Sequence, residues 1–107
     1  PVICQSECFI KPSDTAGDLL STLSKIGCPS LLRCIELIKT GSATPIPQDH
    51  DRSTYAPKVS KSEAFIDWSE DAQQIERKIR AFNPSPVAYT TLNSIRIKSV
   101  HRFAVCK

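Results

Sequence analysis

The sequence has 107 residues, of which 40% are hydrophobic and 23% are charged, and its formal net charge is +3. This length allows one ordinary domain or parts of two, and the composition is typical of a globular rather than a disordered protein. No apolar run approaches the ~18 residues that a membrane span needs, and no targeting segment is recognisable. We therefore expect a cytoplasmic protein that does not bind membranes.

Positive charge gathers in the second half of the chain. Residues 1–50 contain four basic and five acidic side chains, whereas residues 51–107 contain ten basic and six acidic ones. The second half therefore has the better electrostatics for a polyanion such as nucleic acid. A solvated basic face explains the same charge equally well.

The five cysteines and two histidines show no ligand spacing. The cysteines are odd in number and form no CxxC pair: Cys4, Cys8, Cys28, Cys34 and Cys106. Free buried thiols in a reducing cytosol are favoured over a disulfide or a zinc site. His50 and His101 lie far apart, so we expect no metal centre.

The first forty residues predict a strand followed by two helices. Residues 2–10 read as the strand and residues 11–14 as a turn. Thr15 is placed to cap the first helix, with Asp18 as its capping-box partner. Gly27 is expected to end that helix, because glycine readily takes the positive φ of a C′ residue. Pro29 then suits the first position of a second helix, which Gly41 closes.

The stretch from residue 41 to residue 51 is a linker by composition, because it is rich in Pro and polar residues and has no periodic apolar set. Beyond it, residues 65–68 read as a strand and Ser69 as the N-cap of a helix. The apolar stripe of this helix repeats at helical spacing: Ala72, Ile75, Ile79 and Phe82. Pro84 is expected to end the helix, because a proline pushes the preceding residue out of the α region.

Two strands follow, at residues 87–92 and 95–100, around the dipeptide Asn93-Ser94. Asn tolerates positive φ, so a tight hairpin is expected. In the second strand, Arg96 and Lys98 alternate with two isoleucines, which predicts one basic face and one apolar face.

Several of these segments resemble the methionyl-tRNA formyltransferase family. The resemblance lies in the Ile-Asp-Trp of residues 66–68, the Gln-Ile-Glu-Arg of residues 74–77 and the Arg-Ala-Phe-Asn-Pro-Ser-Pro of residues 80–86. It continues to Lys98, and upstream it includes residues 14–17, 31–32 and 55–61. The chain departs from many relatives at Ser85, where a Trp is usual, and at Ser94, where a Gly is usual.

The resemblance implies an α/β fold in three parts. Residues 1–41 would be the C-terminal end of a Rossmann-like formyltransferase domain, and residues 42–57 a linker. Residues 58–107 would be the N-terminal part of an OB-type tRNA-binding β-barrel with an inserted helix. A complete five-stranded barrel does not fit in this length, and the chain begins at Pro1 rather than Met. We therefore expect a portion of a longer protein.

The resemblance also implies the reaction, which is transfer of a formyl group from 10-formyltetrahydrofolate to the amine of methionyl initiator tRNA in translation initiation. The family's catalytic Asn, His and Asp, and its folate site, would lie upstream of Pro1. No catalytic residue can be placed on this chain, which we expect to be inactive by itself. A monomer is favoured.

By the same resemblance, the candidate tRNA contacts are six basic residues, which we expect to act mainly through phosphates: Lys58, Lys61, Arg77, Arg80, Arg96 and Lys98. For Arg80 a structural role is expected equally, in which its side chain pairs with the carboxylate of Asp67 or Glu76. Two other functions stay open. The first is a related enzyme that transfers the formyl group of the same folate donor to another substrate, such as a nucleotide sugar, or that hydrolyses this donor. The second is an OB-like nucleic-acid-binding module without catalysis.

Overall fold

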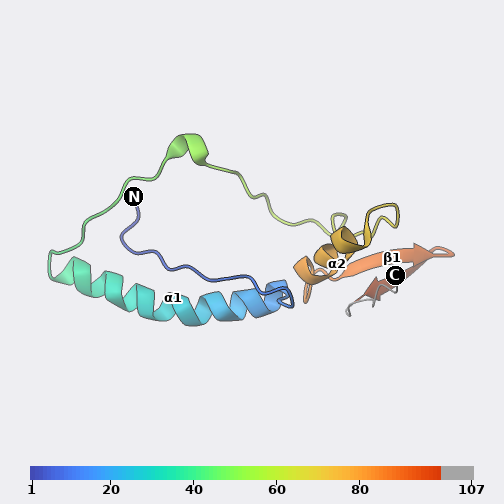
Figure 1. Ribbon diagram of the computed structural model, residues 1–107, viewed down its shortest axis with the longest axis horizontal. Coiled ribbons are helices and arrows are strands. Elements are labelled where there is room, and N and C mark those ends of the chain that lie inside the picture. Colours follow the sequence, from blue (N-terminus) through green and yellow to red (C-terminus); the bar gives the residue numbers. More distant parts are fainter. Residues whose placement is uncertain (100–107) are drawn as a thin grey trace. The chain divides into compact units, whose positions relative to one another are not determined.

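The computed structural model describes residues 1–99, so the predictions for Val100, His101 and Cys106 lie outside the described residues. Its elements are the helix α1 (Ala16–Lys39), the short 3₁₀ helix η1 (His50–Arg52), the helix α2 (Ala72–Ala81) and the strands β1 (Ala88–Leu92) and β2 (Ile95–Ser99) (Figure 1). They belong to two compact units, one formed by residues 1–10 and 20–57, the other by residues 11–19 and the chain from residue 58 onward.

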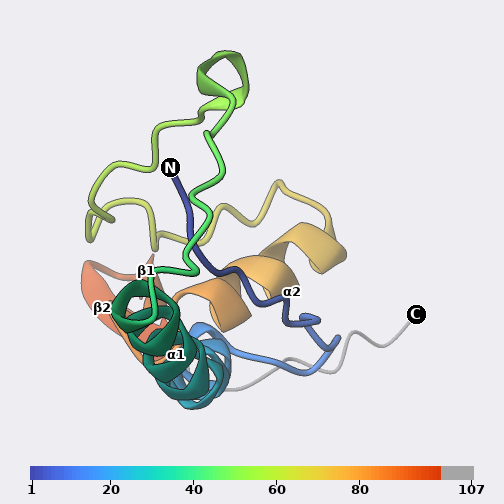
Figure 2. The same cartoon turned by 90° about the vertical axis from the view of Figure 1, so that its left-hand side faces the viewer.

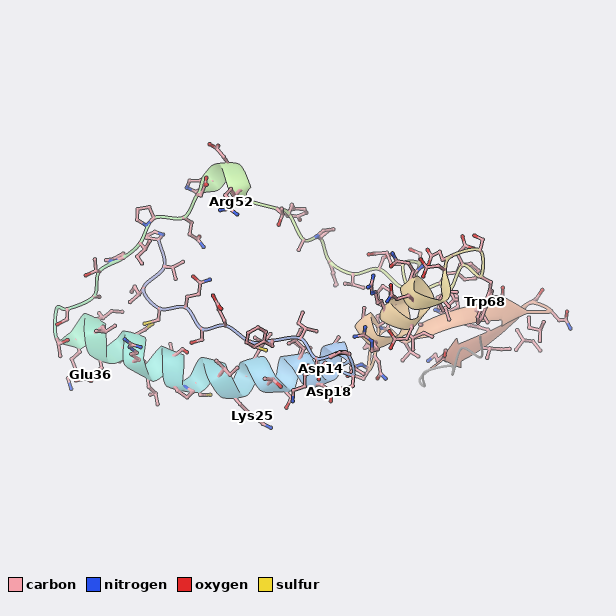
Figure 3. The ribbon with its side chains drawn as sticks, in the orientation of Figure 1. Asp14, Asp18, Lys25, Glu36, Arg52 and Trp68 are labelled. Atoms are coloured by element: carbon pink, nitrogen blue, oxygen red, sulfur yellow. The ribbon has the colours of Figure 1, made fainter. Side chains whose placement is uncertain are left out.

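The start of α1 confirms the predicted capping box. The Thr15 hydroxyl accepts a hydrogen bond from the Asp18 amide at 3.2 Å, and the Thr15 amide donates to Asp18 Oδ2 at 3.0 Å. In Figure 3, Asp14 and Asp18 lie together at this end of the helix. The reciprocal bonds satisfy donors that a helix N-terminus otherwise leaves unpaired.

The predicted break near Gly27 and Pro29 is wrong, because α1 continues through both residues (Figures 1 and 2). Pro29 removes one hydrogen bond to the carbonyl four residues back. A break would cost more, since each new helix end leaves up to four backbone groups unpaired and two residues leave no room for caps. The helix therefore tolerates one lost bond in place of two new ends.

Gly41 closes α1, as predicted. Its φ is 69°, its amide donates to the Ile38 carbonyl at 3.1 Å, and the Ser42 amide donates to the Leu37 carbonyl at 2.9 Å. These two bonds and the left-handed glycine define a Schellman motif. Within the described structure, however, no residue of α1 is buried, and most of its large apolar side chains are exposed.

Residues 2–10 do not form the predicted strand. Val2 makes an isolated antiparallel bridge with Ile46, with two hydrogen bonds of 2.8 Å. Further along, the Ser6 and Ser30 hydroxyls are 2.7 Å apart. A strand needs a ladder of backbone partners, and the described residues supply one rung only.

In the second unit, α2 begins two residues later than predicted. Its N-cap is Asp71, whose carboxylate accepts from the Gln73 and Gln74 amides at 2.8 and 2.9 Å. Ser69 does not cap the helix, because its hydroxyl and amide both donate to Asp67 Oδ1. The local Asp67–Ser69 turn competes with the helix for the same serine.

The apolar stripe of α2 forms the core of this unit. Ile75 and Ile79 are buried against Ile66 and Ala88, and Phe82 packs at the edge of the cluster. Ala72, predicted as part of the stripe, is exposed. The helix ends at Ala81, ahead of Pro84, as predicted.

The predicted hairpin is confirmed. β1 and β2 pair antiparallel from Ala88↔Ser99 to Leu92↔Ile95. Asn93 and Ser94 have φ values of 49° and 64°, the pattern of a two-residue type I′ turn. On the other edge of β1, residues 64–66 add one parallel bridge, Phe65↔Tyr89, in place of the predicted strand. The described residues therefore show a two-stranded sheet and no barrel.

Candidate nucleic-acid interface

The hairpin has two unlike faces, because side chains alternate along a strand. Ala88 and the neighbouring Ile66 point to the α2 side and are 0% and 1% exposed. The register places the opposite set on the other side, which we call the open face. The open face consists of Phe65, Tyr89, Thr91, Arg96 and Lys98.

A cation and two rings form the centre of the open face. The Arg96 Cζ atom lies 3.4 Å from the centroid of the Tyr89 ring. The Phe65 ring meets the Tyr89 ring edge-on, with centroids 5.6 Å apart and planes at 68°. Both arrangements are attractive, because the ring face is electron-rich and the ring edge is electron-poor.

Tyr89 is held at both backbone groups. Its amide donates to the Ala64 carbonyl at 2.9 Å, and its carbonyl accepts from the Ile66 amide at 2.8 Å. Thr90 points to the other side of β1, where its hydroxyl accepts a hydrogen bond from the Trp68 indole N–H at 2.8 Å. The backbone that carries the ring beneath Arg96 is therefore held by Ala64 and Ile66.

Lys98 lies directly opposite Tyr89 in the hairpin register. It is exposed, and within residues 1–99 no hydrogen bond or ion pair engages its ammonium group. The structure thus brings together Arg96 and Lys98 on one strand face, the arrangement that the sequence predicts.

Lys58 and Lys61 precede the hairpin on an exposed connector and likewise have no partner among the described side chains. Lys61 stands in a turn organised by its neighbours, since the Ser60 amide donates to Glu63 Oε1 at 2.7 Å. That hydrogen bond holds the pKa of the Glu63 carboxyl below its usual range. Both lysines are free to reach an anion.

The two arginines of α2 differ. Arg77 is exposed and lines a shallow hollow of about 540 Å³ beside Gln74 and Phe82. Arg80 donates from Nε to Glu76 Oε1 at 2.8 Å and from Nη1 to the Asp14 carbonyl at 3.0 Å, and its side chain is 17% exposed. Of the two partners predicted in its structural alternative, Glu76 is the one seen.

Lys78 is a cation of this region that sequence reasoning missed. Its ammonium group lies 3.0 Å from Glu70 Oε1 and 3.3 Å from the Phe65 carbonyl. The pairs are eight and thirteen residues apart, so no helical spacing rule indicates them. Lys78 ties α2 to the segment that carries Phe65.

Elsewhere the described residues offer little chemistry. No three His, Cys, Asp or Glu side chains within residues 1–99 gather as metal ligands. The described cysteines are free, but the prediction that they are buried is wrong. Cys28 is exposed, and Cys4, Cys8 and Cys34 are half-buried. No helix in this part of the chain is long and apolar enough to cross a membrane.

Comparison with known proteins gives one consistent result. A family model described as "Formyl transferase, C-terminal domain" matches residues 58–103. The methionyl-tRNA formyltransferase of Legionella pneumophila (strain Corby) is 42% identical over 98 residues, which is 92% of this chain and 31% of that protein.

Two further relatives carry the same name. The methionyl-tRNA formyltransferase of Coxiella burnetii (strain RSA 331 / Henzerling II) is 44% identical over 83% of this chain and 28% of its own length. That of Blochmanniella floridana is 43% identical over 91% of this chain and 30% of its own length. The chain therefore spans less than a third of the length of the curated relatives that it matches.

Proposed function

We propose that this chain, which is part of a methionyl-tRNA formyltransferase family protein, contributes the RNA-binding surface of an enzyme that formylates methionyl initiator tRNA. The carrying observation is the match to the named relatives over 83–92% of the chain, together with the C-terminal domain model at residues 58–103. In this proposal the enzyme takes the formyl group from 10-formyltetrahydrofolate, in the cytoplasm, during translation initiation.

The three predicted parts are carried into the proposal. Residues 1–41 would complete the Rossmann-like catalytic domain, residues 42–57 would link the domains, and residues 58–107 would begin the OB-type barrel. The exposed apolar side chains of α1 support the first part, because Leu20, Leu31 and Leu32 are each more than 60% exposed. A helix with such a face is stabilised mainly by a partner that buries it.

The folate site and the catalytic groups are proposed to lie in the rest of the protein, which leaves this chain inactive by itself. The test is a formylation assay with the 107-residue chain and with the complete protein that contains it. Measurable formyl transfer by the chain alone would contradict the proposal.

The proposed RNA contacts are the exposed cations of the second unit, since exposed positive groups bind phosphates by charge. Four of them are proposed as phosphate contacts: Lys58, Lys61, Arg77 and Lys98. Arg96, which stacks on Tyr89, is the fifth RNA contact. Arg80 belongs to the same predicted set, but its bonds to Glu76 and Asp14 compete with any phosphate. We therefore expect Arg80 to contribute least.

The connector lysines provide the sharpest test. Replacing Lys58 and Lys61 by Ala in the complete protein should raise the KM for tRNA, leave the KM for the folate donor unchanged, and lower the salt slope by roughly one unit per lost contact. Lys25→Ala, on exposed α1, is the matched charge control. An unchanged tRNA KM and salt slope would remove the connector from the interface.

The open face also favours a second candidate, a nucleic-acid-binding module without catalysis, because cations and aromatic rings together suit RNA. The two candidates differ in one measurement. RNA binding by the complete protein without any formyl transfer would favour the module, whereas transfer to methionyl initiator tRNA would favour the enzyme.

A further inference from the structure

We propose that the open face holds one unpaired base of the RNA flat against the Arg96 guanidinium, so that Arg96 acts by stacking and not as a phosphate contact. This inference rests on the proposed RNA-binding function. It assigns to Arg96, Tyr89 and Phe65 a base-binding site for a single-stranded nucleotide.

The position of the guanidinium is the first step. A distance of 3.4 Å from Cζ to the ring centroid is a stacking distance, so one face of the guanidinium is covered by Tyr89. Arg96 is nevertheless exposed, which leaves its other face open. The planar faces of arginine accept unpaired bases, as aromatic rings do.

The rigidity of the support is the second step. Phe65 contacts the edge of the Tyr89 ring, and the Tyr89 backbone is bonded to Ala64 and Ile66. The stack Phe65–Tyr89–Arg96 is therefore ordered before any ligand arrives. An ordered platform binds without the entropy loss that a free arginine side chain would suffer.

The neighbouring charge is the third step. Lys98 lies opposite Tyr89 on the same face and has no partner among residues 1–99. A base on Arg96 places its own backbone phosphate beside the strand, where a mobile ammonium group can meet it. One stacking position with an adjacent point charge suits a nucleotide better than a phosphate alone.

The ligand class follows from the chemistry. In an RNA duplex the bases are paired and stacked on one another, so no base plane is free for Arg96. The site therefore selects an unpaired nucleotide, in a loop or at a single-stranded end of the RNA. Duplex RNA would reach only the point charges, through its phosphates.

The test compares two substitutions that keep the charge of the open face. In the complete protein, Arg96→Lys removes the planar group, and Arg52→Lys, the same change at an exposed arginine that is not a proposed RNA contact, is its matched control. Binding of a labelled single-stranded RNA and of its duplex is measured across salt. Arg96→Lys should weaken single-strand binding about 5- to 150-fold, the range for one lost stacking contact, with an unchanged salt slope.

Arg52→Lys should change single-strand binding less than about 2-fold, and duplex binding should be nearly the same in the wild type and in both variants, because each protein keeps its point charges. Tyr89→Leu should reproduce the Arg96→Lys defect, and Tyr89→Phe should not, since it keeps the ring. Duplex binding that is retained in a variant shows that its loss of single-strand binding does not reflect misfolding.

Wild-type single-strand affinity in Arg96→Lys would overturn this inference, as would an equal loss for single strand and duplex. Either result, with salt-dependent tRNA binding intact in the wild type, would leave the proposed function standing. Failure of the wild-type protein to bind tRNA would instead overturn the proposed function itself.

Discussion

Gly17 lies where the start of α1 meets the exit of α2, and an added methyl group there has nowhere to go. An ideal Cβ at Gly17 would be 2.8 Å from Pro84 Cδ and 3.5 Å from Pro84 Cγ. The Gly17 amide donates to the Asn83 carbonyl at 3.0 Å, so the backbone cannot retreat without losing that hydrogen bond. The proline ring is stiff and cannot swing aside as a flexible side chain would.

The expected cost of Gly17→Ala combines three terms. Overpacking at a closed contact costs about 1–3 kcal/mol, and a weakened backbone hydrogen bond costs about 0.5–1.5 kcal/mol. The better helix propensity of alanine returns up to about 1 kcal/mol. We therefore expect a net loss of about 0.5–4.5 kcal/mol in the free energy of unfolding.

Gly27→Ala is the matched control, because Gly27 is in the same helix and a Cβ there would meet nothing within 4 Å. Only the propensity term applies, so this variant should be more stable by about 0.5–1 kcal/mol. Urea denaturation of both variants in the complete protein measures the two shifts, and amide exchange at Gly17 reports the local hydrogen bond. The reasoning would be refuted if the unfolding free energies of the two variants shifted in the same direction. It would also be refuted if the amide of residue 17 exchanged at the same rate in Gly17→Ala as in the wild type.

Two further predictions concern titrating groups. Hydrogen bonds from the Thr15 hydroxyl and amide hold the pKa of the Asp18 carboxyl below its ordinary value of 3.8. The contribution of this carboxylate to helix capping is therefore fully present above pH 3.8, and it is lost as the pH falls through the pKa that Asp18 has in the folded protein. Thr15→Val should move the NMR titration midpoint of Asp18 upward, and an unmoved midpoint would exclude the hydroxyl as the main cause. The hydrogen bond with the Cys4 thiol raises the pKa of Cys34, so iodoacetamide should alkylate Cys34 more slowly than the exposed Cys28. Cys4→Ala should speed that reaction, and an unchanged rate would contradict this assignment.

The features that the sequence predicted correctly depend on residues within a few positions of one another. The Thr15–Asp18 box, the glycine end of α1 at Gly41 and the Asn93-Ser94 turn each close a hydrogen bond over no more than five residues. Their chemistry is local, so a single chain is enough to identify them.

The wrong predictions arise where two local solutions compete. Pro29 fits the first turn of a helix as well as a helix interior that tolerates one lost bond, and the cost of two extra helix ends decides between them. Ser69 and Asp71 are both good N-caps, and Asp67 decides by taking the serine hydroxyl. Propensity ranks such alternatives too closely to separate them.

The candidate site shows the same limit at longer range. Arg77 and Arg80 are the same residue type, three positions apart on one helix, and the sequence left a phosphate contact and a structural role for Arg80 equally weighted. The structure separates them, because Arg80 bonds to a carbonyl 66 positions away in the chain and Arg77 does not. The stack of Arg96 on Tyr89 likewise depends on the hairpin register, which places residues seven apart on one face.

Two of the segments that carry the family resemblance meet in the second unit, and their residue types explain each other. Residues 14–17 supply a carbonyl at Asp14 and a bare Cα at Gly17, while residues 80–84 supply the guanidinium of Arg80 and the ring of Pro84. The guanidinium needs an acceptor at its end, and the ring needs a neighbour without a side chain. A substitution in either segment therefore changes what the other can tolerate, and double-mutant cycles between them should be non-additive.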